Sequence, residues 1–179
     1  MAERPAVERA VASLAERTGG LDAVVTAAGI DRCGTLSEVP ADEWEKVVAV
    51  NLLGTVSTVR AALPYLERSH GTVVTVTSTL GIKAVSDATA YCASKFGIVG
   101  FTRALTAELK GRVRVTLLVP GGMRTAFFDD RPEQYQPGPD AELSPPQDVA
   151  SAVVFALGMP RGVEVRELVV TVSREPSWP

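Results

Sequence analysis

Tyr91 and Lys95 are four positions apart in a segment whose composition is typical of a helix. Residues i and i+4 lie on one face of a helix, so we expect the phenol and the ammonium to be close together. A phenol has an unperturbed pKa of about 10, and a nearby ammonium favours the phenolate. At about 4 Å and an effective dielectric constant of about 20, the attraction is on the order of 4 kcal/mol before the desolvation of the lysine is subtracted. We therefore predict that Tyr91 titrates within reach of neutral pH and exchanges protons with a ligand.

Ser78 precedes this pair and is a second candidate for the same site. Residues 71–78 are predicted to form a buried strand rich in β-branched residues, and a glycine-containing loop then leads to the helix. The carboxyl ends of strands are where open α/β sheets bind ligands. A Tyr-x-x-x-Lys pair alone is more often part of an ordinary amphipathic helix than of a site. The strand–loop–helix context favours the catalytic interpretation.

Two further segments have residue types that are unusual for their positions. Asn51 lies among apolar residues inside a predicted helix, where an amide is either a hydrogen-bonded core residue or part of a site. The run Pro120-Gly121-Gly122-Met123-Arg124-Thr125 directly follows a predicted buried strand. Pro-Gly by itself predicts only a turn, but its place at a strand end favours a ligand-binding turn.

These motifs, in this order, resemble those of the short-chain dehydrogenase/reductase family. The matching segments are Ser78, Tyr91-Cys92-Ala93-Ser94-Lys95, Val50-Asn51-Leu52-Leu53-Gly54 and the run from Pro120 to Thr125, and the resemblance extends over residues 5–172. It implies an α/β fold, a Rossmann-like doubly wound parallel sheet, and an NAD- or NADP-dependent oxidoreductase that interconverts a ketone and a secondary alcohol by hydride transfer. Small-molecule ketones or alcohols are the implied substrates.

The resemblance also implies a role for each residue of the site. Tyr91 would exchange a proton with the substrate oxygen, and Ser78 would hold that oxygen. Lys95 would lower the pKa of Tyr91 and bind the nicotinamide ribose. Asn51 would open its helix locally and anchor a water that relays protons to Lys95.

Cofactor contacts implied by the resemblance come from several loops. The residues are Ala28, Gly29, Tyr91, Lys95, Pro120, Gly121 and Thr125. Residues 26–29 resemble the family's Asn-Asn-Ala-Gly motif, but Thr26 and Ala27 replace the two asparagines. The family's Gly-rich phosphate loop and the residue that selects NAD or NADP do not occur in this sequence, so the choice between these cofactors is left open.

The missing loop leads to two alternative expectations about the chain as a whole. The first is an oxidoreductase whose fold is N-terminally truncated to about four strands, with residues 1–179 forming a single, partial domain. The second is a non-catalytic homologue that acts as an interaction or dimerisation protein. The retained Ser, Tyr, Lys and Asn residues favour the first alternative, and the missing glycines favour the second.

Hydrophobic periodicity predicts alternating helices and strands. Helices are expected at residues 5–17, 40–66, 89–109 and 147–158, and strands at 21–26, 71–78, 113–119 and 164–172. Nearly continuous apolar strands are typical of a parallel sheet covered on both faces, and the first strand is expected to be an exposed edge. Ser144 has capping-box spacing before the last helix.

Two segments are expected to lack regular structure. Residues 126–143 are rich in proline, charge and aromatics, and we predict that they form a substrate loop. Phe127 and Phe128 in this loop indicate a mostly apolar substrate. The tail, residues 173–179, is expected to be loose.

Composition excludes several kinds of partner. A net charge of -3 and a pI near 5.3 give no basic patch, which argues against nucleic acid and against an anionic membrane surface. The two cysteines, Cys33 and Cys92, are not grouped with other potential metal ligands in the sequence. They are expected to be free thiols, and no metal is expected. His70 is expected to be solvated. Without a signal-peptide pattern or an apolar run of about 18 residues, a cytoplasmic location is expected.

The two long helices carry more apolar residues than one buried face requires. Examples are Val56, Val59, Leu63, Ile98, Val99, Phe101 and Leu105. A surplus apolar face needs a partner, so we expect a homo-oligomer built on these helices. The alternative is that one face of the sheet covers all of them.

Overall fold

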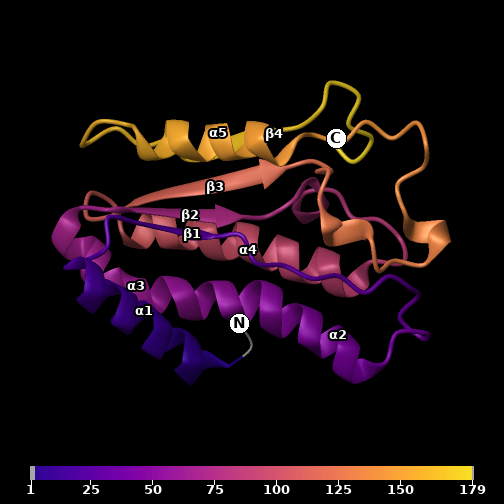
Figure 1. The fold of residues 1–179 in the computed structure, drawn as a ribbon, viewed down its shortest axis with the longest axis horizontal. Helices are drawn as coiled ribbons and strands as arrows, with labels where there is room; N and C mark the ends of the chain where they lie inside the picture. The colour runs from indigo at the N-terminus through magenta and orange to yellow at the C-terminus, as the bar shows by residue number, and fades with distance from the viewer. Residues whose placement is uncertain (1–2, 179) are drawn as a thin grey trace.

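The sheet of the computed structural model, which describes residues 3–178, has four parallel strands in the order β1-β2-β3-β4. The strands are β1 (Ala23–Thr26), β2 (Thr72–Val76), β3 (Arg114–Pro120) and β4 (Glu167–Val170). Because all of the strands run in one direction, their carboxyl ends meet at the same edge of the sheet (Figure 1). The predicted α/β class and the predicted number of strands are confirmed.

Helices pack on both faces of the sheet and lie where the hydrophobic periodicity predicts them. They are α1 (Arg4–Thr18), α2 (Ala41–Val48), α3 (Gly54–Ser69), α4 (Thr89–Glu108) and α5 (Pro146–Leu157). A π-helical turn, Ala49–Leu53, joins α2 and α3 into one continuous rod. The expected local opening of the helix at Asn51 is therefore present.

Alternate side chains of the central strands pack in opposite directions. Val73 and Val115 belong to a core cluster with Leu66 of α3 and Leu105 of α4. The neighbouring Val74 and Leu118 instead pack with residues of α5, including Val149 and Val153. This alternation explains why β2 and β3 are apolar throughout, since each has helices on both of its faces.

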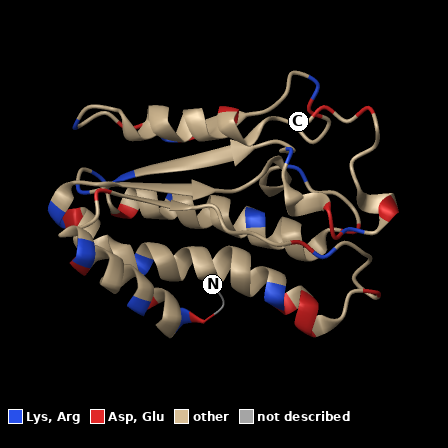
Figure 2. Ribbon diagram, in the orientation of Figure 1, with Lys and Arg blue, Asp and Glu red and all other residues tan. Residues whose placement is uncertain are grey.

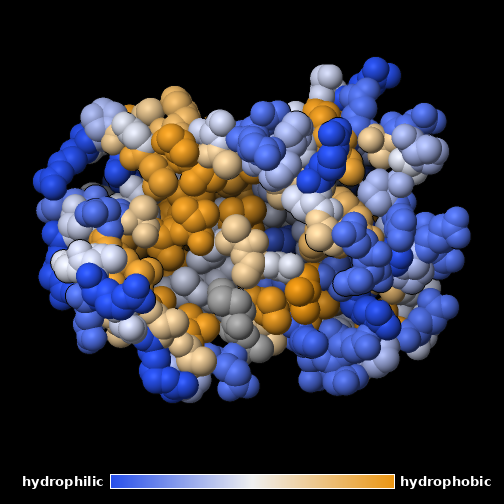
Figure 3. Space-filling view, viewed as in Figure 1, coloured by the Kyte–Doolittle hydropathy of each residue, from blue (hydrophilic) through white to orange (hydrophobic). Residues whose placement is uncertain are grey.

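β1 is an edge strand, as its sequence predicts. Its Val25 side chain is 41% exposed, and Leu14 of α1 and Phe155 of α5 are also exposed. Apolar side chains gather over the sheet between α1 and α5 on the face shown in Figure 3. The described residues thus leave part of one sheet face uncovered.

The expected capping box at Ser144 is wrong. The residue that precedes α5 is Pro145, and no side chain caps this helix. Ser144 instead donates its N–H to the carbonyl of Gly122 and accepts the N–H of Arg124 at its own carbonyl. Backbone pairing with the turn after β3 holds this serine away from the helix terminus.

The continuous rod formed by α2, the π-helical turn and α3 spans Ala41–Ser69. It is long and apolar enough to cross a membrane by length and composition alone, a test that core helices of soluble proteins also pass. In this fold it packs against α1, α4 and the sheet. Charged residues of both signs are scattered over the helices and loops (Figure 2).

Candidate active site

Ser78 lies just beyond the carboxyl end of β2, where the chain enters a 3₁₀ turn, Thr79–Gly81. Its Oγ accepts the N–H of Leu80 at 3.1 Å, which fixes the start of this turn. Thr77 Oγ1 donates to the carbonyl of Lys95 at 2.9 Å and so ties the strand end to α4. A Cβ at Gly81 would overlap Thr77 Oγ1, so this close approach of loop and helix requires glycine.

Tyr91 and Lys95 lie on the buried face of α4 and are only 8% and 4% exposed. Lys95 Nζ is 5.5 Å from the centre of the Tyr91 ring, as the i, i+4 spacing predicts. The same Nζ donates to the carbonyl of Val76 at 3.1 Å. The end of β2 therefore holds the lysine beside the phenol.

The expected depression of the Tyr91 pKa is not found. Burial raises the pKa of Tyr91 to about 12, and the hydrogen bond from Ser78, which lowers it, offsets only part of this rise. Burial also lowers the pKa of Lys95 to about 8. The prediction fails because burial removes water from both groups, which favours the neutral form of each.

Asn51 is fully buried in the π-helical turn, and its side chain is fully hydrogen-bonded. Its Oδ1 accepts the N–H of Ile30 at 2.8 Å, and its Nδ2 donates to the carbonyl of Ile30 at 2.9 Å and to Ser94 Oγ at 3.0 Å. The main-chain carbonyl of Asn51 accepts from Thr55 Oγ1 at 2.7 Å. Asn51 thus joins the loop after β1 to α4, behind the reacting side chains.

A cavity of about 810 Å³ opens at the carboxyl ends of the strands. Most of the predicted site residues line it: Gly29, Ser78, Tyr91, Lys95, Pro120, Gly121 and Thr125. Ala28 is exposed, and Ala27 lines the cavity in its place. Asn51 is not a lining residue, but it lies close behind one, because a Cβ at Gly29 would contact both Asn51 and Lys95.

Arg131, which lines the cavity, and its partner Asp31 are not among the residues predicted from the sequence. The Arg131 guanidinium lies 4.9 Å from the ring centre of Phe127 and 4.7 Å from that of Phe128. Phe127 in turn packs on Tyr91, with ring centres 5.6 Å apart. The only signal in the sequence is that Arg131 is the single basic residue in the acidic segment 126–143.

The expectation of a loose tail is wrong for the described residues 173–178; Pro179 lies outside them. Glu175 and Ser177 line the cavity and hydrogen-bond to the loops around it. Periodicity gives no signal for such a segment, because short turns held by side chains have no repeat.

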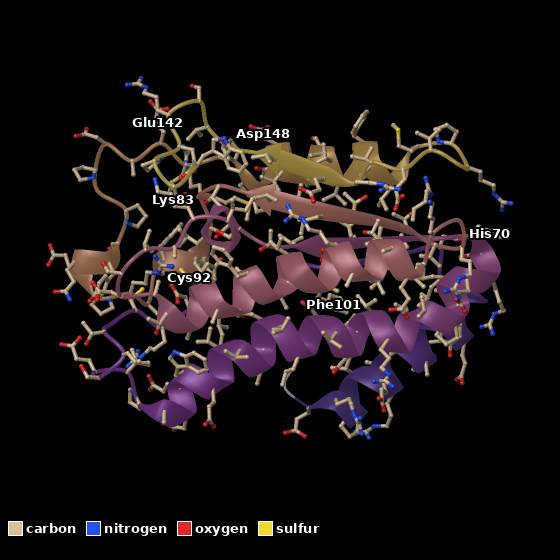
Figure 4. The ribbon with its side chains drawn as sticks, turned by 180° about the vertical axis from the view of Figure 1, so that it is seen from behind. His70, Lys83, Cys92, Phe101, Glu142 and Asp148 are labelled. Carbon is tan, nitrogen blue, oxygen red and sulfur yellow. The ribbon has the colours of Figure 1, made fainter. Side chains whose placement is uncertain are left out.

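Of the other reactive side chains, His70 lies far from this cluster, whereas Cys92 packs beside Tyr91. His70 is at the opposite end of the molecule from Lys83 and Cys92 (Figure 4). Cys92 is a buried free thiol and Cys33 a half-buried one. Within residues 3–178, no three His, Cys, Asp or Glu side chains are grouped in a way that could hold a metal ion.

Comparison with known proteins places this chain in a family. Residues 1–136 match the family model of the short chain dehydrogenases. An uncharacterised oxidoreductase of Staphylococcus aureus strain MW2 is 38% identical over 160 residues, which cover 88% of this chain and 67% of the relative. A 3-oxoacyl-[acyl-carrier-protein] reductase of Thermotoga maritima is 30% identical over 160 residues, which cover 86% of this chain and 65% of that protein.

Solved structures agree with this assignment. An alcohol dehydrogenase from the archaeon Thermococcus sibiricus, complexed with 5-hydroxy-NADP, superposes with a TM-score of 0.83 at 29% identity. The match covers 94% of this chain and 70% of that one. A short-chain dehydrogenase from Streptomyces avermitilis, at 22% identity and a TM-score of 0.80, has the same fold, with 94% of this chain and 67% of that one covered.

The chain belongs to the short-chain dehydrogenase family. By this resemblance it is an enzyme of the oxidoreductase class with a Rossmann-like α/β fold, as the motifs predict. It spans about two thirds of the length of the relatives that it matches.

Proposed function

We propose that this chain carries the reacting half of an NAD- or NADP-dependent oxidoreductase that interconverts a ketone and a secondary alcohol. The observation that carries the proposal is that Ser78, Tyr91 and Lys95, from a strand end and a helix, line one cavity. The carbonyl group of a ketone could reach a phenol and a hydroxyl there at the same time.

The residues present fit the nicotinamide end of such a cofactor. Lys95, Pro120, Gly121 and Thr125 line the cavity with Tyr91 and would hold the nicotinamide and its ribose. The cofactor would supply the hydride, which no amino-acid side chain can provide. Only a few backbone positions, such as Gly29, are available for the adenosine end, because the sequence contains no Gly-rich phosphate loop.

Within this proposal, Tyr91 is the proton donor in the direction of ketone reduction. Its raised pKa keeps the phenol protonated at neutral pH, so a proton is available for the developing alkoxide. Ser78 would hold the substrate oxygen beside the phenol. Lys95 would return the proton from solvent through a relay water, which Asn51 would anchor by the second lone pair of its main-chain carbonyl, because its side chain is already engaged.

The proposed substrate is a mostly apolar ketone or secondary alcohol, bound under the loop of residues 126–143. Phe127, Phe128 and Leu143 of this loop line the cavity. Replacing both phenylalanines by alanine should raise the KM for bulky apolar ketones more than the KM for small ones. If the double variant turned over bulky and small ketones as well as the unchanged chain does, the loop would have no role in substrate binding.

The test of the reaction is Tyr91→Phe, assayed with the purified chain at millimolar NADH or NADPH over a panel of ketones. We expect slow turnover by the unchanged chain and a loss of at least about a hundredfold in the variant, the size typical of general acid–base catalysis. Tyr65→Phe is the matched control, since Tyr65 lies on α3, where it stacks with Arg68. Full activity of Tyr91→Phe would overturn the assignment.

A second candidate is a non-catalytic interaction protein in the cytoplasm that uses residues 1–179 as one partial domain. The observation that favours it is the uncovered apolar face beside β1, where Val25 is exposed. Turnover at millimolar cofactor that Tyr91→Phe abolishes would reject this candidate. The absence of turnover by a chain that remains folded would support the non-catalytic candidate.

A further inference from the structure

The tail after β4 folds back over the carboxyl ends of β2 and β3, where the C-terminus lies in Figure 1. Its residues 174–177 line the same cavity as Ser78 and Tyr91. Lys83 and Glu142, which contact the tail, lie at this end of the molecule in Figure 4. The tail therefore forms one wall of the candidate active site.

Glu175 makes the most hydrogen bonds in this wall through its side chain, because both of its carboxylate oxygens are acceptors. Oε2 accepts the N–H of Gly122 at 3.0 Å, in the turn after β3. Oε1 accepts the N–H of Ser177 at 3.2 Å and the hydroxyl of Ser177 at 2.5 Å. A Cβ at Gly121 would overlap Oε2, so the carboxylate can reach this turn only because Gly121 has no side chain.

The hydrogen bonds continue from Glu175 to the residue that follows Ser78. Ser177 Oγ and Thr79 Oγ1 are 2.6 Å apart. The geometry of this pair does not by itself determine which hydroxyl is the donor. A carboxylate only accepts, so Ser177 must give its proton to Glu175 and accept the proton of Thr79. Thr79 is only 1% exposed and is the first residue of the turn that Ser78 caps.

We propose that Glu175 is a positioning residue of the active site. It holds the Gly121–Gly122 turn, and through Ser177 and Thr79 it also holds the loop that begins at Ser78. The two loops follow different strands, and the Glu175 carboxylate joins them across the cavity. This inference rests on the proposed function only for the statement that Ser78 acts on a substrate.

The other polar contacts of the tail are weaker candidates for this role. The ion pair of Arg174 and Glu142, at 3.0 Å, has side chains that are 84% and 44% exposed, so it adds little rigidity. Lys83 Nζ donates to the carbonyl of Pro176 at 3.1 Å, but it does so from an exposed position. Neither contact reaches both of the loops.

The test is amide hydrogen exchange in the purified chain with Glu175→Ala. The amides to follow are those of Leu80, Ile82 and Lys83, which bond within the Ser78 loop and not to Glu175. We expect their exchange to become at least about tenfold faster, the change produced by about 1.4 kcal/mol of lost protection. The amides of Val74 and Leu117 in the sheet serve as the internal reference for overall stability.

Two matched variants complete the design. Arg174→Ala removes the neighbouring side chain and its exposed ion pair, and it should leave the exchange of the Ser78 loop unchanged. Glu175→Gln keeps an oxygen for the N–H of Gly122 and should restore part of the protection. Unchanged exchange of Leu80, Ile82 and Lys83 in Glu175→Ala would overturn the inference, and so would equal acceleration at Val74 and Leu117. Because the readout needs neither cofactor nor turnover, its result is independent of the proposed reaction.

Discussion

Arg131 Nη2 lies 2.7 Å from Asp31 Oδ2 and joins residues that are 100 positions apart. Asp31 belongs to the loop after β1, and Arg131 belongs to the loop that carries Phe127 and Phe128. The two side chains are only 4% and 18% exposed. This ion pair therefore holds the predicted substrate loop against the loop that follows β1.

Breaking this pair should destabilise the protein. Asp31→Asn removes the charge that compensates the guanidinium, and the Nε of Arg131 already has no partner among the described residues. We expect the free energy of unfolding to fall by about 2 kcal/mol in chemical denaturation. Arg103→Ala breaks an exposed pair with Glu167 and should cost only about 0.5 kcal/mol. Equal losses in both variants would show that the buried pair has no special role.

Lys95 should make stability depend on pH. In the unfolded chain Lys95 has its ordinary pKa of 10.5, and in the folded chain its pKa is about 8. Between these values the unfolded state holds more protons, so the free energy of unfolding rises with pH. Above pH 10 the raised pKa of Tyr91 has the opposite effect, because the folded state then holds the extra proton.

The measurement is chemical denaturation of the unchanged chain and of Lys95→Met between pH 7 and pH 10. From pH 8 to pH 10, the unchanged chain should gain on the order of 2 kcal/mol relative to the variant. Parallel curves for the two proteins would contradict the lowered pKa of the lysine.

Cofactor binding by the 179-residue chain is expected to be weak. Much of the affinity for a dinucleotide comes from backbone N–H groups and a helix N-terminus that face its pyrophosphate, and the sequence has no Gly-rich loop to provide them. A loss of about 4 kcal/mol would turn a micromolar Kd into a millimolar one. Fluorescence titration with NADH and NADPH checks this, and saturable micromolar binding would contradict it.

We expect the chain to self-associate, but through residues other than most of those that the sequence suggested. Val59, Ile98, Val99 and Leu105 are buried in the core, so they offer no surface to a partner. Leu53, at 56% exposed, and Phe96, at 43%, remain on the surface of the two long helices. We expect light scattering to show a homo-oligomer that the double variant Leu53→Glu and Phe96→Glu converts to a monomer.

Leu36→Glu is the control for that experiment. Leu36 is 68% exposed but lies outside the long helices, so its replacement should leave the oligomer intact. A monomer at micromolar concentration before any substitution would refute the prediction.

The sequence alone was sufficient for the elements and for most of the predicted residues that the fold brings to one cavity. Apolar runs such as the one around Val73 and Val74 predict buried strands, and helical periodicity locates α4 with Tyr91 and Lys95 on one face. These features are local, because they depend on the chain's own repeat. The motif resemblance was sufficient for the family, since Ser78, Asn51 and Pro120 are matched by type and order.

Only the tertiary structure decided the electrostatics and the walls of the cavity. The pKa of Tyr91 rises because neighbouring elements exclude water from it, and residue spacing carries no measure of that desolvation. Asp31 meets Arg131, and Glu175 meets Gly122, across long stretches of sequence with no repeat to connect them. Such contacts depend on how the loops at the strand ends fold over one another, and that arrangement exists only once the parallel sheet has brought those ends to one edge.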